Sequence, residues 1–116
     1  MQLPEEGYLL RIFIGEADKF QGKPLYEWLV LQARDQGLAG ATVLRGMMGY
    51  GANSREIHTF KITRLSEDLP IVIEIVDTKE KLETYQKSID ESIQAGMVTL
   101  EKATIRIYRG NGKGAE

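Results

Sequence analysis

Three closely spaced glycines behind an arginine form the segment of this chain best suited to binding an anion. Arg45 begins the segment, and Gly46, Gly49 and Gly51 follow it. Glycine lacks a Cβ atom, so backbone N–H groups in such a run can approach a phosphate closely. The same spacing is typical of turn and β-bulge glycines. The pattern therefore supports an anion site and a purely structural role about equally.

Cationic side chains follow this segment. Arg55, His58 and Lys61 are potential phosphate donors, and arginine can bind phosphate through two hydrogen bonds. His58 is the single histidine, which excludes a histidine-rich metal site. Ser54 and Ser66 lack a recognisable catalytic elbow or an orienting acid beside His58. We therefore expect neither a catalytic residue nor a metal ligand here.

Two further groups of carboxylates have positions that suggest a specific role. Glu67 and Asp68 could hold Mg²⁺ through oxygen ligands, although such a pattern more often caps a turn before a strand. Glu74 lies inside an apolar run, and a buried carboxylate normally requires a partner. A cross-strand or intersubunit salt bridge is therefore expected for Glu74, rather than a role as a catalytic acid.

The composition narrows the class of protein. A chain of 116 residues suits a single domain, here 1–116. With 15 basic and 17 acidic residues, the net charge of −2 supplies no field that would draw the protein to nucleic acid or an anionic membrane. The absence of cysteine excludes disulfides and thiolate sites. Short apolar runs and an N-terminus without a basic leader predict a cytoplasmic protein with no membrane insertion.

Hydrophobic periodicity predicts the strands that must position these residues. Alternation predicts a first strand over 8–14, and a Thr-, Val- and Met-rich run predicts a second over 41–48. The β-branched run over 71–76 is too apolar for an exposed edge, so it is expected near the centre of the sheet. Alternation of Ile105 and Ile107 predicts a last strand over 104–108.

Helical spacing predicts two helices and leaves two irregular segments. The first helix is expected between Pro24 and Gly37, and the second from Asp77, acting as the cap, to Gly96. A long loop over about 49–69 contains a short strand or hairpin arm around 58–63. The glycine-rich tail over about 110–116 is expected to be mobile.

This order of elements, strand, helix, strand, then strand, helix, strand, predicts an α+β fold. It fits a ferredoxin-like βαββαβ sandwich, a four-stranded antiparallel sheet with two helices on one face. Leu9, Phe13, Val72 and Val76 alternate onto one side of the sheet, and the helices cover either that side or the other. In both cases a second apolar face needs a partner, and oligomerisation supplies one.

Short runs spread over nearly the whole chain match a known pattern. They include Gly40-Ala41-Thr42-Val43, Arg45-Gly46, Gly49-Tyr50-Gly51, His58, Leu65-Ser66 and the stretch from Asp68 through Glu74 to Asp77. In these runs the sequence resembles the uncharacterised PII-like family called domain of unknown function one-ninety. More distantly, Gly49-Tyr50-Gly51, Leu69-Pro70 and Glu74 are similar to segments of the nitrogen-regulatory PII signalling proteins.

The resemblance implies a homotrimer that binds an adenine nucleotide in clefts between subunits and signals occupancy to a partner protein through the long loop. The phosphate-contacting lysine of PII proteins would fall at Lys102, and Arg106 could replace their C-terminal arginines. The glycines that precede that lysine in PII proteins are absent here, so AMP or ADP is expected rather than ATP, optionally with Mg²⁺. The implied nucleotide-binding residues are Arg45, Gly46, Gly49, Tyr50, Gly51, Ala52, Arg55, His58, Lys102 and Arg106.

Two other functions remain open on the sequence. One is a small metal-binding or enzymatic protein that uses His58, Glu56 and Asp68, which would require these side chains to converge. The other is a structural or RNA-binding ferredoxin-like module. The mild acidity and the lack of an aromatic pair of the RNA-recognition type disfavour that module.

Overall fold

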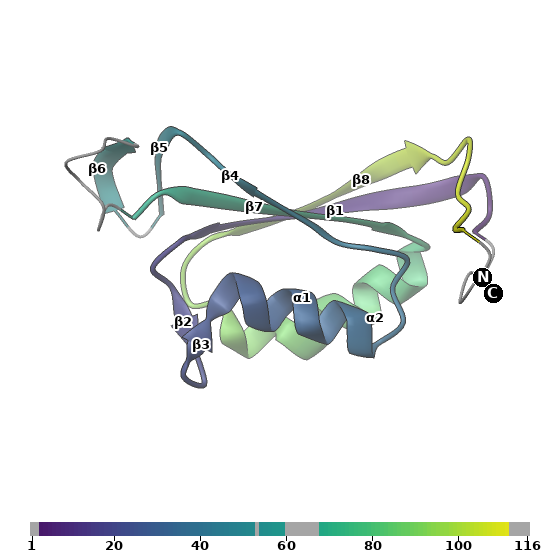
Figure 1. The fold of residues 1–116 in the computed structure, drawn as a ribbon, viewed down its shortest axis with the longest axis horizontal. Coiled ribbons are helices and arrows are strands. Elements are labelled where there is room, and N and C mark those ends of the chain that lie inside the picture. Colours follow the sequence, from purple (N-terminus) through teal and green to yellow (C-terminus); the bar gives the residue numbers. More distant parts are fainter. Residues whose placement is uncertain (1–2, 53, 60–67, 112–116) are drawn as a thin grey trace.

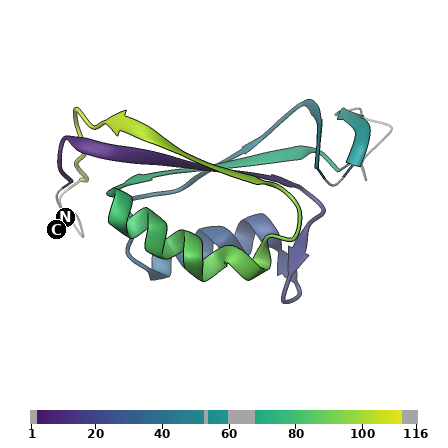
Figure 2. The same cartoon turned by 180° about the vertical axis from the view of Figure 1, so that it is seen from behind.

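The computed structural model describes residues 3–52, 54–59 and 68–111. Four strands form one antiparallel sheet in the order β4-β7-β1-β8, and two helices pack beneath it (Figure 1). The strands are β1 (Glu6–Gly15), β4 (Thr42–Arg45), β7 (Pro70–Asp77) and β8 (Met97–Thr104). The helices are α1 (Leu25–Asp35) and α2 (Lys79–Ile89), and the view from behind shows both on the same face (Figure 2). This is the predicted βαββαβ arrangement.

The core lies between the sheet and the helices because the apolar periodicities of the two layers meet there. On the central strands every second residue is buried, and these residues are Leu10, Ile12, Ile14, Ile71, Ile73 and Ile75. The helices bury Leu25, Leu29 and Ala33 from α1 and Leu82, Tyr85 and Ile89 from α2. Each large aliphatic side chain removed from water contributes roughly 1.5–3 kcal/mol to folding. The central position predicted for 71–76 is confirmed.

The prediction of a last strand over 104–108 is wrong. The fourth strand of the sheet is β8, which ends where that prediction begins. Val98 and Leu100 of β8 lie opposite Ile12 and Leu10 of β1 and pack against the core. Ile105 instead crosses the start of β1, where its side chain occupies the space that a Cβ on Gly7 would need.

The second helix begins and ends differently from its prediction. Thr78 is the N-cap, and its hydroxyl accepts a hydrogen bond from Lys81 N at 3.2 Å, so the assignment of Asp77 as the cap is wrong. The α-helix stops at Ile89, and a short 3₁₀ turn, η1 (Asp90–Ser92), follows it. Gly96, predicted to close the helix, lies just before β8 with φ +150°.

The predicted second strand is divided. β4 ends at Arg45, and β5 (Met48–Gly51) forms a separate hairpin with β6 (Ser54–Thr59) at one end of the molecule. β6 confirms a strand in the long connection, while 60–67, including the rest of the predicted arm, lies outside the described residues. A second hairpin, β2 (Lys19–Phe20) with β3 (Lys23–Pro24), was not predicted from the sequence.

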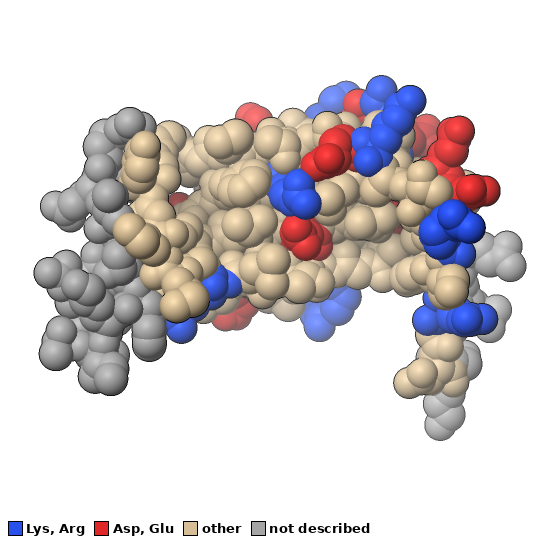
Figure 3. Space-filling view, turned by 90° about the horizontal axis from the view of Figure 1, so that it is seen from above, with Lys and Arg blue, Asp and Glu red and all other residues tan. Residues whose placement is uncertain are grey.

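The face of the sheet turned away from the helices is covered by no helix of the described residues. Leu9, Phe13, Val72 and Val76 lie on it and are half-buried, and Leu44 of β4 is 48% exposed. Figure 3 looks onto this face and shows uncharged residues over most of it, with charged side chains in the middle and towards the end where β8 finishes. We call this surface the open face, and it is the predicted second apolar face.

Candidate functional site

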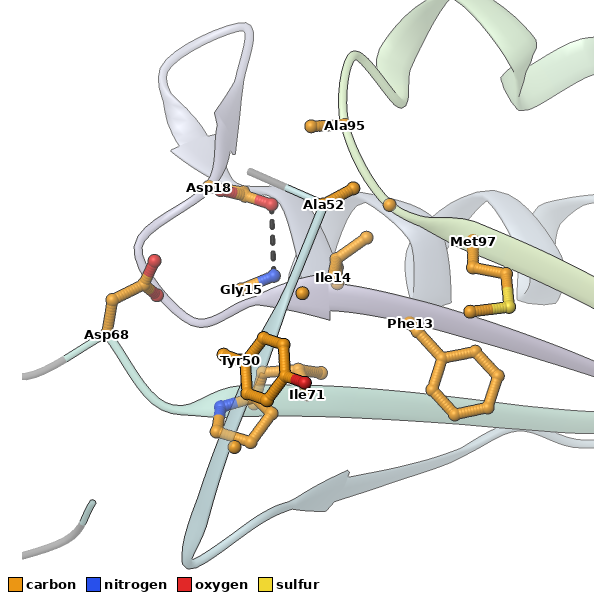
Figure 4. Close-up of a pocket in the computed structure, with 14 residues that line it drawn as sticks. Phe13, Ile14, Gly15, Asp18, Tyr50, Ala52, Asp68, Ile71, Ala95 and Met97 are labelled. Carbon is orange, nitrogen blue, oxygen red and sulfur yellow. Dashed lines mark hydrogen bonds between the residues drawn. The ribbon is translucent and has the colours of Figure 1, made fainter. Parts of the chain in front are cut away.

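A cavity of about 220 Å³ opens at the end of the sheet where β1 finishes and β7 and β8 begin (Figure 4). Its lining comes from residues 13–15, 49–52, 70–71 and 95–97, together with Asp18 and Asp68. These segments are far apart in the chain, and the antiparallel sheet brings them together. We call this cavity the end pocket.

The side chains of the end pocket are mostly apolar. Phe13, Ile14, Ile71 and Met97 supply hydrophobic surface, and Tyr50 adds an aromatic ring on the β5 side (Figure 4). The charged side chains that line it within the described part of the chain are two carboxylates, and none is basic. The pocket therefore suits an apolar, planar group better than a bare anion.

The glycines of the 46–51 segment have different surroundings. A Cβ on Gly46 would lie 2.7 Å from Cγ of Pro70, and a Cβ on Gly49 would lie 3.1 Å from the same atom. The N–H of Gly46 already donates to Pro70 O at 2.7 Å. Gly51, in contrast, has no heavy atom within 4 Å of its Cβ position and lines the pocket. Two of these glycines therefore serve close packing, and Gly51 leaves space beside the pocket.

Asp18 and Asp68 are held by the turn that follows β1. Asp18 Oδ2 accepts a hydrogen bond from Gly15 N at 3.0 Å, and Asp68 Oδ1 accepts one from Ala17 N at 2.7 Å. A Cβ on Gly15 would lie 2.8 Å and 2.9 Å from the two oxygens of Asp68, so the carboxylate rests directly on the glycine backbone. Asp68 thus caps a turn, the commoner of the two roles considered from the sequence.

Among the predicted cationic ligands whose side chains the structure describes, Arg45, Lys102 and Arg106 do not line the end pocket within one subunit. Lys102 lies on β8 opposite Tyr8, five residues beyond Met97 (102 − 97), which is about 17 Å along a strand. Arg106 lies after the end of β8 and lines a different hollow, together with Val76 and Ala103. Arg45 ends β4 and pairs with Glu16, with 3.2 Å between Nε and Oε2.

Other predicted site residues lie on β6. Arg55, Glu56 and His58 are on this strand, and their side chains lie outside the described part of the structure. Their proposed roles, in nucleotide binding or in a metal site, stay predictions. In the described ranges, His, Asp and Glu side chains form no group of three or more that could hold a metal ion.

A charged group occupies the middle of the open face. Arg11 Nε donates to Glu74 Oε2 at 2.9 Å, and its NH1 donates to Glu101 Oε1 at 2.7 Å. The hydrogen bond to Glu74 is the main cause that raises the pKa of the Arg11 guanidinium above its ordinary value. The cross-strand partner predicted for Glu74 is confirmed.

A shallow groove of about 550 Å³ lies at the opposite end of the open face. It runs between that face and the segment after β8, and Arg106, Glu74 and Val76 are among its lining residues. Tyr108 donates a hydrogen bond to Ala39 O at 2.7 Å and so fastens this segment to the loop before β4. We call it the far groove. The end pocket and the far groove lie at opposite ends of the same strands.

Sequence reasoning identified only part of the end pocket. The glycine spacing indicated residues 49–52, but nothing local marked Asp18 or residues 13–15 as belonging to the same site. Residues 95–97 carried one signal, Gly96 between a helix and the following strand, and this glycine was interpreted as a helix stop.

None of the described helices is both long enough and apolar enough to span a bilayer.

Comparisons with known proteins agree with this architecture. A UPF0166 protein of Aquifex aeolicus (strain VF5) is 41% identical over 97 residues, which cover 84% of this chain and 90% of the relative. Among solved structures, the chain resembles CPII of Thiomonas intermedia K12, bound to ADP and bicarbonate, with a TM-score of 0.63, 18% identity and coverage of 86% and 88%. It also resembles B. subtilis GlnK in an ATP complex, with a TM-score of 0.58, 15% identity and coverage of 97% and 94%.

These structural similarities show that the fold is PII-like. The sequence match covers most of the chain, because the DUF190 family model, described as uncharacterized ACR, COG1993, matches residues 7–105. This chain therefore belongs to the DUF190 family.

Proposed function

We propose that this protein is a regulatory module that binds an adenine nucleotide, AMP or ADP, in clefts between the subunits of a homotrimer. Binding would be signalled to a partner protein through the long loop over about 49–69, within the connection between β4 and β7. The observation that carries the proposal is the end pocket, where residues 49–52 meet residues 95–97 beside an apolar wall. We propose that the protein binds the nucleotide and does not catalyse a reaction on it.

The apolar part of the end pocket fits the base of a nucleotide. Phe13, Ile14, Ile71 and Met97 offer surface to a planar ring, and Tyr50 lies at the β5 side. Aromatic and aliphatic contacts of this kind provide most of the burial in small-ligand sites, while a few polar groups set the orientation. Asp18 and Asp68 supply acceptors for N–H groups of the base.

We propose that cations from another subunit help to bind the phosphates. In the described part of the chain, the charged residues that line the end pocket are acidic, whereas Lys102 and Arg106 lie towards the other end of the sheet. Copies arranged head to tail would place the far end of one sheet against the end pocket of the next. A head-to-tail contact of this kind closes into a ring when the rotation is suitable, and a trimer is the smallest such ring beyond a dimer.

The open face supports the same assembly. Its apolar side chains, among them Leu9, Leu44 and Val76, are only partly covered in one subunit. Contiguous apolar surface on a soluble protein commonly marks an interface. The PII-like proteins that share this fold provide a further argument, because CPII was solved with ADP and GlnK with ATP.

The direct test is titration calorimetry with AMP, ADP, ATP and cyclic AMP, combined with sedimentation equilibrium of the free protein. We expect three subunits per particle, one nucleotide per subunit, and stronger binding of AMP or ADP than of ATP. A stable monomer, or no heat from any of these nucleotides at millimolar concentration, would show that the proposal is wrong.

Subunit complementation tests whether the site is shared. One variant, Ala95→Trp, blocks the end pocket and keeps the cations, and a second, Lys102→Ala with Arg106→Ala, keeps the pocket and loses the cations. Each variant alone should bind nucleotide weakly. In trimers co-expressed at equal amounts, roughly a quarter of the sites would combine an intact pocket with intact neighbouring cations and should recover wild-type affinity. No recovery would place both sets of residues in one subunit or outside the site.

A further inference from the structure

We infer that Asp68 is a positioning residue that couples occupation of the end pocket to both roots of the connection between β4 and β7. This inference rests on the proposed function and goes beyond it, because it names the contact that transmits occupancy. The roots are the two described segments where that connection leaves and rejoins the sheet, at residues 45–51 and 68–70. The 15–18 turn contacts both of them.

Three successive residues of the turn, 15–17, contact the returning root at residues 68–70. Gly15 carries the carboxylate of Asp68 directly on its backbone, with no space for a side chain between them. Glu16 N donates to Leu69 O at 2.8 Å, and Ala17 N donates to Asp68 Oδ1 at 2.7 Å. A hydrogen bond to a carboxylate is shorter and stronger than one between neutral groups. A shift of the turn therefore moves the returning root with it.

The departing root also contacts the same turn. Glu16 Oε2 lies 3.2 Å from Arg45 Nε at the end of β4. Just beyond, Gly46 N donates to Pro70 O at 2.7 Å, which joins the two roots to each other. Both roots and the turn thus form one connected unit, and Glu16 contacts a residue of each root.

The end pocket is built against this unit. Gly15, Asp18 and Asp68 line it together with residues 49–52 (Figure 4). Asp68 Oδ1 already accepts the N–H of Ala17, and a carboxylate has further lone pairs for a ligand donor. A ligand that contacts Asp68 therefore changes the free energy of the link between the turn and the roots, which is the requirement for coupling.

Hydrogen exchange measured by mass spectrometry, with and without saturating ADP, tests the inference. In the wild-type protein we expect ADP to slow exchange at least tenfold at residues 15–18 and at both roots, residues 45–51 and 68–70. Asp68→Ala should weaken ADP binding, because Asp68 lines the pocket. When the ADP concentration is raised until the variant is as fully occupied as the wild type, it should still lose the slowing at 45–51. Asp68→Asn keeps an oxygen that can accept the Ala17 N–H, so it should restore the slowing. Asp90→Asn, on an exposed turn, is the matched control and should behave as wild type.

The outcomes separate this inference from the proposed function. If ADP does not bind the wild-type protein, the proposed function is wrong. If ADP binds and Asp68→Ala retains the slowing at 45–51, or loses it only in proportion to affinity, the coupling role is wrong and nucleotide binding stands. Glu16→Gln is a second variant that removes the charge from the contact with Arg45, and it should weaken the slowing at 45–51 more than that at 68–70. Equal weakening at both roots would also overturn the coupling.

Discussion

Arg11 and Glu74 lie opposite each other on β1 and β7, and Arg11 Nε donates to Glu74 Oε2 at 2.9 Å. The same guanidinium reaches Glu101 of β8, so one cation serves two carboxylates across three strands of the sheet. All three residues lie on the open face, which the proposed trimer would cover. Their removal should therefore affect assembly more than the fold of one subunit.

Arg11→Ala leaves Glu74 and Glu101 without their shared cation. In the trimer these carboxylates would become less solvated, and their unpaired charges should weaken assembly at least tenfold. Sedimentation equilibrium over a range of protein concentrations measures this effect. Arg34→Ala on the exposed side of α1 is the control, because Arg34 also lies near a carboxylate, that of Asp35. Equal assembly of the two variants would contradict this prediction.

Asp77→Ala should destabilise the fold strongly. Asp77 is fully buried, and its carboxylate accepts hydrogen bonds from Ala39 N at 2.9 Å and from Thr78 N at 2.7 Å. Alanine would leave these donors without an acceptor, at a cost of about 3 kcal/mol in the free energy of unfolding. Urea unfolding followed by circular dichroism measures it. Asp90→Ala, at an exposed position, should change the same quantity by no more than about 0.5 kcal/mol. A similar change in both variants would show that the buried carboxylate is not required.

Gly96→Ala should affect both stability and the end pocket. Gly96 has φ +150°, and a Cβ there would lie 2.5 Å from the backbone oxygen of Phe13. We expect a loss of about 2 kcal/mol in the free energy of unfolding, because the backbone on both sides must move. Nucleotide affinity should fall as well, since Gly96 lines the pocket. Gly40→Ala, where no heavy atom lies within 4 Å of the Cβ position, is the control and should be nearly neutral.

The burial of Tyr85 should make the free energy of unfolding depend on pH in the alkaline range. The side chain is buried, its hydroxyl donates to Leu29 O at 2.7 Å, and burial raises the pKa of the phenol above its ordinary value. Above pH about 10 the unfolded chain releases this proton while the folded protein keeps it. This group's contribution is therefore complete below pH 10 and falls above it, by about 1.4 kcal/mol per pH unit until the folded pKa is reached.

A comparison with Tyr85→Phe isolates this effect. At neutral pH the variant should be less stable by about 1 kcal/mol, because the hydrogen bond to Leu29 is lost. Above pH 10 the difference in the free energy of unfolding between the two proteins should shrink and then reverse sign, since phenylalanine does not titrate. Parallel curves of stability against pH would show that Tyr85 titrates alike in the folded and unfolded states.

The local sequence pattern determined the layers of this protein. Alternation over 8–14 identified β1, and the β-branched apolar run over 71–76 identified β7. The helical stripes through Leu29 and Tyr85 identified α1 and α2. These patterns suffice because burial on one face imposes a period of two on a strand and of 3.6 on a helix. The order of the elements then allowed few topologies, and the chain adopts the expected one.

Local periodicity did not predict the last strand of the sheet or the N-cap of α2 correctly. β8 is an edge strand that packs only Val98 and Leu100 against the core, so its alternation is weak, while the stronger alternation of Ile105 and Ile107 lies outside the sheet. Both Asp77 and Thr78 are good cap residues. The tertiary structure decides between them. The backbone N–H of Ala39, which is distant in the chain, donates a hydrogen bond to the carboxylate of Asp77, so Thr78 is left to cap the helix.

The candidate site was decided almost wholly by tertiary structure. The spacing of the glycines indicated residues 49–52, since the sequence itself shows which residues lack a Cβ atom. The partners of that run, Gly15, Asp18, Asp68 and residues 95–97, come from three other parts of the chain. Local periodicity specifies which face of an element is buried, but which strand ends meet depends on register and crossover. Those are properties of contacts between distant residues.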